Sequence, residues 1–336
     1  MSLPIEQVVA LYSLLLTPIP QLSAIGLSVS TLDVLGCLRL ALAVKQIKHS
    51  LRLKAAKKAV VNGGPEAVAM SEKLERSNVG AEINLATIWS MFVIVYGGEL
   101  LISSFVSEPP SFFTSATGPI MFTLSHVVIE QGFKFLPSLL PIQPNLKWEL
   151  PFAILDALAR SALLCSYTPP YILGHRLATI RENPQALLLC GMLNANAGFF
   201  LVNTFSMLSP NGWSVQTPPE LEPWGWTSLD ILVAPIMTAL FATLTHSQSV
   251  WRDAHIQATS YMGYGPLKGN FTTTNEKYSG AGTTDSAPFD DESARAICAM
   301  ILMGLFSGRA LKNFGGMPAF ARMIGMGSTQ QKLKTQ

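Results

Sequence analysis

Seven long apolar runs follow one another along the chain, and each approaches the ~20 residues that a helix needs to cross a bilayer. Only 13% of the residues are charged, whereas a soluble domain has roughly 25%. The mean hydropathy is +0.34, and a soluble core has room for one such run but not for all of them. We therefore predict an all-α membrane protein with seven transmembrane helices. The runs cover residues 22–44, 84–106, 112–133, 150–173, 185–208, 227–248 and 293–312.

The segments outside these runs differ in composition. Residues 1–20 are apolar and end at two prolines, and we expect them to lie in the membrane interface or to cap the bundle. They lack the basic start of a cleaved signal peptide. Residues 45–82 begin with a basic stretch, residues 250–292 are polar, and residues 313–336 are Gly-rich. We expect the last two segments to be a flexible loop and a disordered tail.

Lysines and arginines near the ends of the runs predict the orientation in the membrane. The stretch from Lys45 to Lys58 is dense in them, and the segment after the last run adds Lys312 and Arg322. With seven spans, both segments lie on the same side of the membrane, which we expect to be the cytosol. The N-terminus then lies on the opposite side.

Short stretches of the first three runs recur in the next three. The stretch "LDVLGCLRLAL" from Leu32 resembles "LDALARSALL" from Leu155, and "YGGELLISSF" from Tyr96 resembles "NAGFFLVNTF" from Asn196. A third pair is "GPIMFTLSH" and "APIMTALFATLTH". Because the matches fall in the same order, we predict two three-helix repeats, residues 21–133 and 149–249, followed by a seventh helix at 293–312.

Repeats with an odd number of spans and no helix between them must have opposite orientations in the bilayer. Such inverted repeats, related by a pseudo-two-fold axis in the membrane plane, are found in transport proteins. Their functional path lies near the midplane, where helices are broken and freed carbonyls face protein or water. The sequence places glycines or prolines at such points, and we predict that they shape a pore or its gate: Gly97, Gly98, Pro119, Gly191, Gly198 and Pro235.

An ionisable side chain inside a span is costly and is therefore a candidate functional group. Asp156 and Arg160 are one helical turn apart, so they either form an ion pair that fixes the helix or place Arg160 on the path. His126 and Glu130 likewise form a structural pair or an ion relay, and two such residues are too few for a metal site. Glu99 has an apolar counterpart in the second repeat, so its carboxylate breaks the symmetry and is a candidate attractor of cations.

The order of these features resembles the trimeric intracellular cation channels, the TRIC family. The resemblance covers residues 84–312 and rests on the paired glycines, on two inverted three-helix units with a seventh helix, and on "LLISSFVSEPP", which is similar to the end of the family's second helix. It implies a homotrimer with one pore in each protomer. The family conducts monovalent cations, chiefly potassium, across the endoplasmic reticulum membrane as counter-ions for calcium release and uptake. The N-terminus would then be luminal and the C-terminus cytosolic.

The family also carries a basic motif in its fourth helix that holds a phosphoinositide headgroup. In the corresponding stretch of this chain, only Arg160 matches the motif, and the basic insertion at 45–82 departs from the compact animal members. The resemblance is therefore to a divergent, fungal type of member, with a phosphoinositide or another anionic lipid as the expected bound cofactor. The candidate lipid-binding residues are Lys45, Lys48, Arg52, Lys147 and Arg160.

Other classes of function have little support in the sequence. The four cysteines lie inside predicted spans without metal-ligand spacing. We find no nucleotide-binding loop or hydrolase motif and expect neither an enzyme nor a metal site, and a net charge of +2 gives no reason to expect nucleic acid. Two alternatives remain open: a secondary transporter built from inverted repeats, and a membrane scaffold that binds lipid through the basic stretch.

Overall fold

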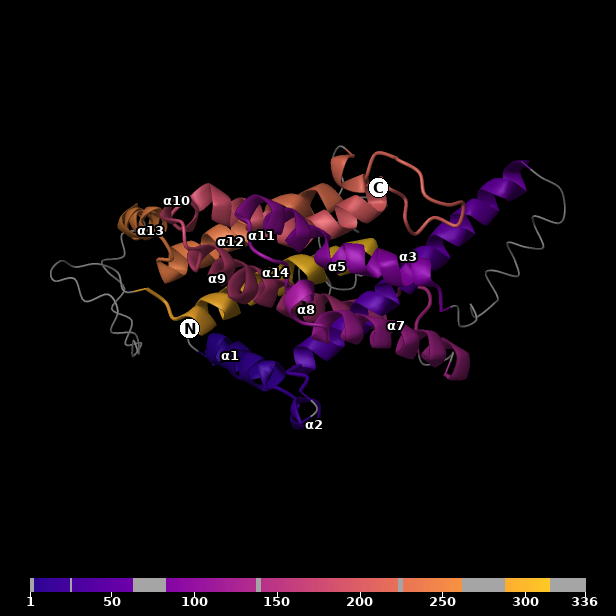
Figure 1. Ribbon diagram of the computed structural model, residues 1–336, viewed down its shortest axis with the longest axis horizontal. Coiled ribbons are helices and arrows are strands. Elements are labelled where there is room, and N and C mark those ends of the chain that lie inside the picture. Colours follow the sequence, from indigo (N-terminus) through magenta and orange to yellow (C-terminus); the bar gives the residue numbers. More distant parts are fainter. Residues whose placement is uncertain are drawn as a thin grey trace, which may run out of the picture.

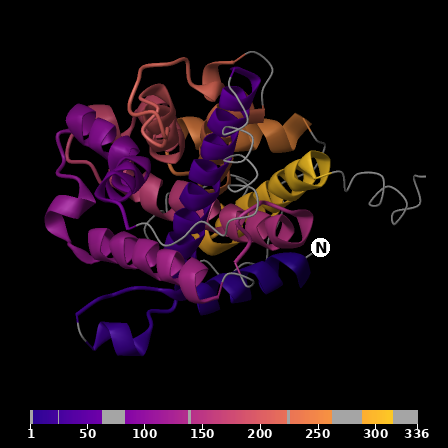
Figure 2. The same cartoon turned by 90° about the vertical axis from the view of Figure 1, so that its right-hand side faces the viewer.

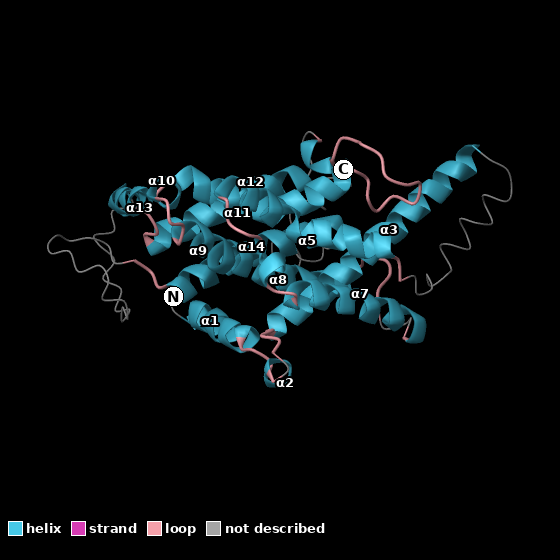
Figure 3. Ribbon diagram, in the orientation of Figure 1, coloured by secondary structure: helices cyan, strands magenta, loops and turns pink. Residues whose placement is uncertain are grey.

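The structure, a computed structural model, describes residues 3–24, 26–62, 83–136, 140–222, 226–261 and 288–314. Throughout these residues the regular elements are helices (Figure 3), joined by loops and a single β-bridge between Pro18 and Ser30. The long helices are α1 (Leu3–Leu16), α3 (Thr31–Asn62), α5 (Leu85–Val106), α7 (Thr117–Phe135), α8 (Leu146–Ala162), α11 (Pro184–Thr204), α12 (Trp226–Thr245), α13 (Ser249–Tyr261) and α14 (Asp291–Asn313). The short ones are α2 (Pro20–Ser23), α6 (Ser111–Thr114), η1 (Leu163–Tyr167), α9 (Thr168–Leu173), α10 (Ala178–Arg181) and η2 (Pro219–Leu221).

Four helices within the described residues are long and apolar enough to cross a bilayer: α5, α8 with its continuation to Leu173, α11 and α14. A fifth crossing results if α12 and α13, which are bent by 82° relative to each other, count as one broken span. The prediction of an all-helical integral membrane protein is thus confirmed at this level, with four or five candidate spans. The count of seven stays a prediction.

The predicted first and third spans, in α3 and α7, are less apolar because both carry charged residues. Lys45 on α3 and Glu130 on α7 form an ion pair in which both side chains are almost completely buried, 6% and 5% exposed. Two of the charges that lower the hydropathy of these helices, one on each, therefore neutralise each other inside the protein. A reading of each helix by itself misses such a pair.

Helix boundaries differ from the sequence prediction in three places. The first long helix begins at Thr31 instead of residue 22, and Asp33 fixes its start by accepting hydrogen bonds from the backbone N–H and the hydroxyl of Ser30. The same helix continues to Asn62, so the whole basic stretch from Lys45 to Lys58 is helical. Residues 249–261, expected to lie in a flexible loop, form α13. The remaining parts of the expected loops and tail, residues 63–82, 262–287 and 315–336, lie outside the described residues.

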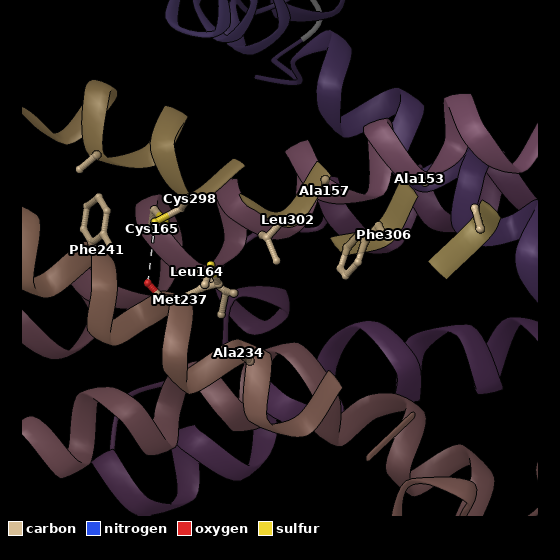
Figure 4. Packing of buried hydrophobic residues seen from close by; sticks show 12 residues of the cluster. Ala153, Ala157, Leu164, Cys165, Ala234, Met237, Phe241, Cys298, Leu302 and Phe306 are labelled. Atoms are coloured by element: carbon tan, nitrogen blue, oxygen red, sulfur yellow. Dashed lines mark hydrogen bonds between the residues drawn. The ribbon is translucent and has the colours of Figure 1, made fainter. Parts of the chain in front are cut away.

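The helices form an elongated bundle in which α5 packs on α11, α8 on α14, and α3 on α7 (Figure 1). One end of α3 projects beyond the bundle, at the end opposite α10 and α13 (Figure 1), and Figure 2 looks onto the end from which it projects. Small side chains line the contact between α8 and α14, including Ala153, Ala157 and Ala294, and permit close approach of the two helices (Figure 4).

The helix α1 packs against this bundle. Tyr12 is completely buried, and its hydroxyl donates a 2.8 Å hydrogen bond to the carbonyl of Leu158 on α8. The guanidinium of Arg295 on α14 lies over the Tyr12 ring, 4.6 Å from its centre. These contacts hold α1 against α8 and α14, and its role in the membrane interface or as a cap of the bundle stays a prediction.

Replacing Tyr12 with phenylalanine tests this attachment. The ring and its contact with Arg295 remain, but the hydrogen bond to Leu158 is lost, so we expect the free energy of unfolding to fall by about 1 kcal/mol. Thermal unfolding of the purified protein in detergent measures the effect. The matched control is Tyr261→Phe, because Tyr261 is 90% exposed. Equal melting temperatures for the two variants would contradict the attachment.

Candidate functional site at the crossing of α5 and α11

The helices α5 and α11 run antiparallel and cross near their middles. At one end of the contact, the hydroxyl of Ser90 lies 3.4 Å from the carbonyl oxygen of Met207. At the other end, Val106 packs in one apolar cluster with Leu187 and Cys190. The order along one helix is therefore the reverse of the order along the other, as for equivalent helices of opposite orientation.

Glycines make the crossing of α5 and α11 possible. A methyl group added at Gly98 would lie 2.9 Å from the Cα atom of Asn194, and one added at Gly198 would lie 2.7 Å from the Cα atom of Ile94. Gly97 also lies against Gly198, with 3.3 Å between its added methyl and the Cα atom. The two backbones thus touch, and side chains other than hydrogen would separate them.

The contacts of the two glycines are reciprocal. The predicted repeat aligns the stretch from Tyr96 with the stretch from Asn196, an offset of 100 positions, by which Gly98 corresponds to Gly198 and Ile94 to Asn194. The contact of Gly98 with Asn194 and the contact of Gly198 with Ile94 therefore lie at equivalent positions of the two predicted repeats. Both helices remain α-helical through these residues. The glycines allow the backbones of α5 and α11 to approach each other closely. A kink of either helix at these glycines stays a prediction.

The other predicted helix-breaking residues are spread over three neighbouring helices. Gly191 on α11 lies against the side chain of Thr238 on α12. Pro235 lies inside α12, whereas Pro119 lies in the first turn of α7, where its missing N–H leaves no hydrogen bond unmade. Pro119 therefore begins a helix rather than interrupting one.

Arg160 on α8 points to the middle of α11. Its guanidinium donates a 2.8 Å hydrogen bond to the carbonyl of Ala195 and lies 3.4 Å from the side-chain oxygen of Asn196. Both residues lie within one turn of Gly198. A fixed positive charge is thus placed beside the glycine crossing, in the middle of two candidate spans.

A π-helix that the sequence did not predict lies beside this charge. The fourth apolar run is interrupted at η1, and the hydroxyl of Thr168 donates to the carbonyl of Leu163 at 2.9 Å. The side-chain amide of Asn194 in turn donates to the same hydroxyl at 3.0 Å. Single π turns recur at functional sites. The sequence signal was Thr168 followed by two prolines, which disturb the regular helix before them.

Asp156 pairs with Arg39 on α3, a partner that the spacing along the chain did not indicate. The Arg39 guanidinium lies 3.2 Å from Asp156 and 3.4 Å from Glu149, and its face lies over the Phe152 ring. Two carboxylates thus share one guanidinium, and the Asp156 side chain is 40% exposed. The ion pair joins the two predicted repeats, because α3 belongs to the first and α8 to the second.

A second polar cluster lies where α3, α5 and α7 meet. Lys45 binds Glu130, and Lys48 donates a hydrogen bond to the hydroxyl of Thr87 on α5. Both ring nitrogens of His49 and the Nε2 atom of His126 are buried without a hydrogen-bond partner among the described residues. Two of the predicted lipid-binding lysines, Lys45 and Lys48, thus contribute to packing between helices.

The remaining predicted lipid-binding residues lie apart from each other. Arg52 is half-buried on α3, and Lys147 is exposed in the first turn of α8. Arg160 lies at the crossing of α5 and α11. Lys45, Lys48 and Arg52 thus lie on α3, whereas Lys147 and Arg160 lie on α8.

Glu99, the candidate cation attractor, accepts hydrogen bonds from Ser111 in the loop that follows α5. One carboxylate oxygen accepts from the Ser111 backbone N–H and the other from the Ser111 hydroxyl, at 2.8 Å. Both oxygens are therefore engaged within the protein.

In the described part of the chain, no group of three or more His, Cys, Asp or Glu residues is arranged to hold a metal ion. No family model, curated protein or solved structure matches this chain.

Proposed function

We propose that this chain is a channel for monovalent cations, chiefly potassium, in an intracellular membrane. The observation that carries the proposal is the reciprocal contact at the crossing, where Gly98 meets Asn194 and Gly198 meets Ile94. Two inverted three-helix repeats place their equivalent helices against each other in this manner, and such repeats are typical of transport proteins. The resemblance to the TRIC family points in the same direction.

The polar groups around the crossing support a path at this place. The side chains of Thr168 and Asn194 and the guanidinium of Arg160 lie where a membrane protein normally buries apolar side chains. Polar and ionised groups at such depth commonly line ion paths. The carboxylate of Asp156 is partly exposed beside them and supplies negative charge for a cation.

The proposal includes the membrane, the orientation and the assembly of the channel. We place the channel in the endoplasmic reticulum or another endomembrane, with a luminal N-terminus, a cytosolic C-terminus and three copies per assembly. Its potassium flow balances charge during calcium release and uptake. A bound phosphoinositide or other anionic lipid fits the basic stretch, although Lys45 and Lys48 also bind neighbouring helices.

Potassium flux from liposomes that contain the purified protein separates this proposal from its alternatives. A channel gives potassium efflux that does not saturate with concentration in the manner of a carrier. Saturable uptake of a solute without potassium efflux would favour an inverted-repeat transporter. Absence of both, together with binding to anionic liposomes that is lost on deletion of residues 45–82, would favour a lipid-binding scaffold.

Arg160→Gln gives a directional test of the path. Because a fixed positive charge beside the path repels cations, we expect its removal to raise the potassium flux severalfold. The matched control is Arg181→Gln, since Arg181 is exposed and pairs with the exposed Glu182. Equal fluxes in the two variants would place Arg160 off the path.

A further inference from the structure

The loop between α5 and α7, residues 107–116, folds back along α5, and we call it the strap. The helix α5 ends at Val106, yet Ser111 of the strap reaches Glu99, which lies seven residues earlier in the helix. At a rise of 1.5 Å per residue, the strap returns about 10 Å along the helix axis. It therefore lies beside the helix rather than beyond its end.

Two contacts hold the strap to α5. Glu99 accepts hydrogen bonds from the N–H and the hydroxyl of Ser111 with its two carboxylate oxygens. The ring of Phe112 packs on the ring of Tyr96, with 4.9 Å between the ring centres. A carboxylate inside an apolar helix is costly, and these bonds to Ser111 offset part of that cost.

Further contacts hold the base of the strap to the second half of the chain. The backbone N–H of Leu177 donates to Nδ1 of His175, so the other ring nitrogen of a neutral His175 carries the proton. That nitrogen lies 3.1 Å from the carbonyl oxygen of Val106, the last residue of α5. The hydroxyl of Tyr171 on α9 also lies 3.4 Å from the carbonyl oxygen of Glu108. The strap thus links α5 to α9 and the loop after it.

Tyr96 connects the strap to the glycine crossing. It precedes Gly97 directly, and its hydroxyl lies so close to Gly118 of α7 that a methyl group there would overlap it. Its ring also packs edge-on against Phe122, at 6.3 Å. If the strap moves away from α5, Phe112 leaves the Tyr96 ring and one side of that ring loses its packing. Tyr96 is one residue from Gly97, where α5 contacts α11.

We propose that the strap is a gate, and that its docked position holds the channel closed. Docked, it joins the ends of α5 and α9 and fixes Tyr96 beside the crossing. Released, it frees the end of α5 to move away from α9. This inference rests on the proposed channel function, and it gives Glu99 the role of a latch.

Glu99→Leu tests the latch, because leucine suits the apolar helix but cannot accept a hydrogen bond. Hydrogen–deuterium exchange of the backbone amides in residues 107–116 reports docking directly, and potassium flux reports opening. Because the strap loses both hydrogen bonds to the carboxylate, we expect exchange to become about tenfold faster or more. The flux should rise in the same variant.

Two further variants make the experiment interpretable. Ser111→Ala keeps the backbone N–H bond to Glu99 and loses only the hydroxyl bond, so it should show a smaller change in the same direction. Glu182→Leu removes an exposed carboxylate that pairs only with its exposed neighbour Arg181 among the described residues, and should change neither exchange in the strap nor flux. The exchange measurement needs no conduction.

Three outcomes would overturn the gate. Unchanged exchange in Glu99→Leu would show that Glu99 does not hold the strap. Faster exchange with unchanged potassium flux would show a latch that controls no opening. A lower flux with unchanged exchange would make Glu99 a cation attractor instead. Absence of potassium flux in both the unmodified protein and Glu99→Leu would refute the channel itself, and the exchange data would then still show whether Glu99 docks the strap.

Discussion

Gly198→Ala is expected to push α5 and α11 apart and to abolish most potassium flux. The added methyl group would overlap the backbone of Ile94, which, unlike a side chain, cannot move to another rotamer. Overpacking of this kind costs about 1–3 kcal/mol, which exceeds the gain of up to ~1 kcal/mol that alanine brings to a helix. We therefore expect a lower free energy of unfolding despite the better helix former.

Gly304→Ala is the matched control for this substitution. Gly304 lies inside α14, and a methyl group added there meets nothing within 4 Å. The variant should keep its flux and gain up to about 1 kcal/mol of stability. If Gly198→Ala were as stable and as active as Gly304→Ala, the close approach at the crossing would have no part in stability or conduction.

Glu130→Leu is expected to destabilise the protein by about 3–5 kcal/mol, because it removes the buried carboxylate that neutralises the charge of Lys45. Both side chains of the ion pair are more than nine-tenths buried. The Lys45 ammonium also lies 5.1 Å from the centre of the Phe133 ring, a contact too weak to replace a carboxylate. Thermal or denaturant unfolding in detergent measures the loss.

The double substitution Lys45→Met with Glu130→Leu distinguishes an ion pair from a simple packing role. Replacing both charges by apolar groups of similar size removes the unpaired charge, so most of the lost stability should return. Lys54→Met, at an exposed position on α3, controls for the loss of a lysine. A double variant as unstable as Glu130→Leu alone would argue against the charge account.

The sequence predicted that the chain is helical and that Gly98 and Gly198 are equivalent residues. It did not predict the partners of the charged residues. Pairing Gly98 with Gly198 by the repeat anticipated two residues that lie in one crossing. Spacing along a helix suggested Asp156 and Arg160 as a pair, whereas the structure pairs Asp156 with Arg39. The spacing of residues along the sequence indicates only neighbours on the same helix. The contact of Asp156 with Arg39 joins two helices, so it depends on which helices pack together.

The site at Glu99 shows the same limit. Its symmetry-breaking carboxylate was visible in the sequence, but its partner Ser111 follows two prolines in a loop whose backward course no periodicity predicts. The π turn at η1 was also missed, although Thr168 and the two prolines after it were visible in the sequence. Ser111 begins the one-turn helix α6 and η1 is a π turn, so neither contact follows from the spacing of a long α-helix.

Single-channel recording in a planar bilayer with a potassium chloride gradient tests the central claim most directly. The claim is that the antiparallel crossing of α5 and α11 lies at the centre of a cation path. It predicts discrete channel openings whose reversal potential lies near the potassium equilibrium potential, and far fewer openings in Gly198→Ala than in Gly304→Ala. A bilayer that stays silent with correctly inserted protein, in the unmodified chain and in Glu99→Leu alike, or a reversal potential near that of chloride, would contradict it.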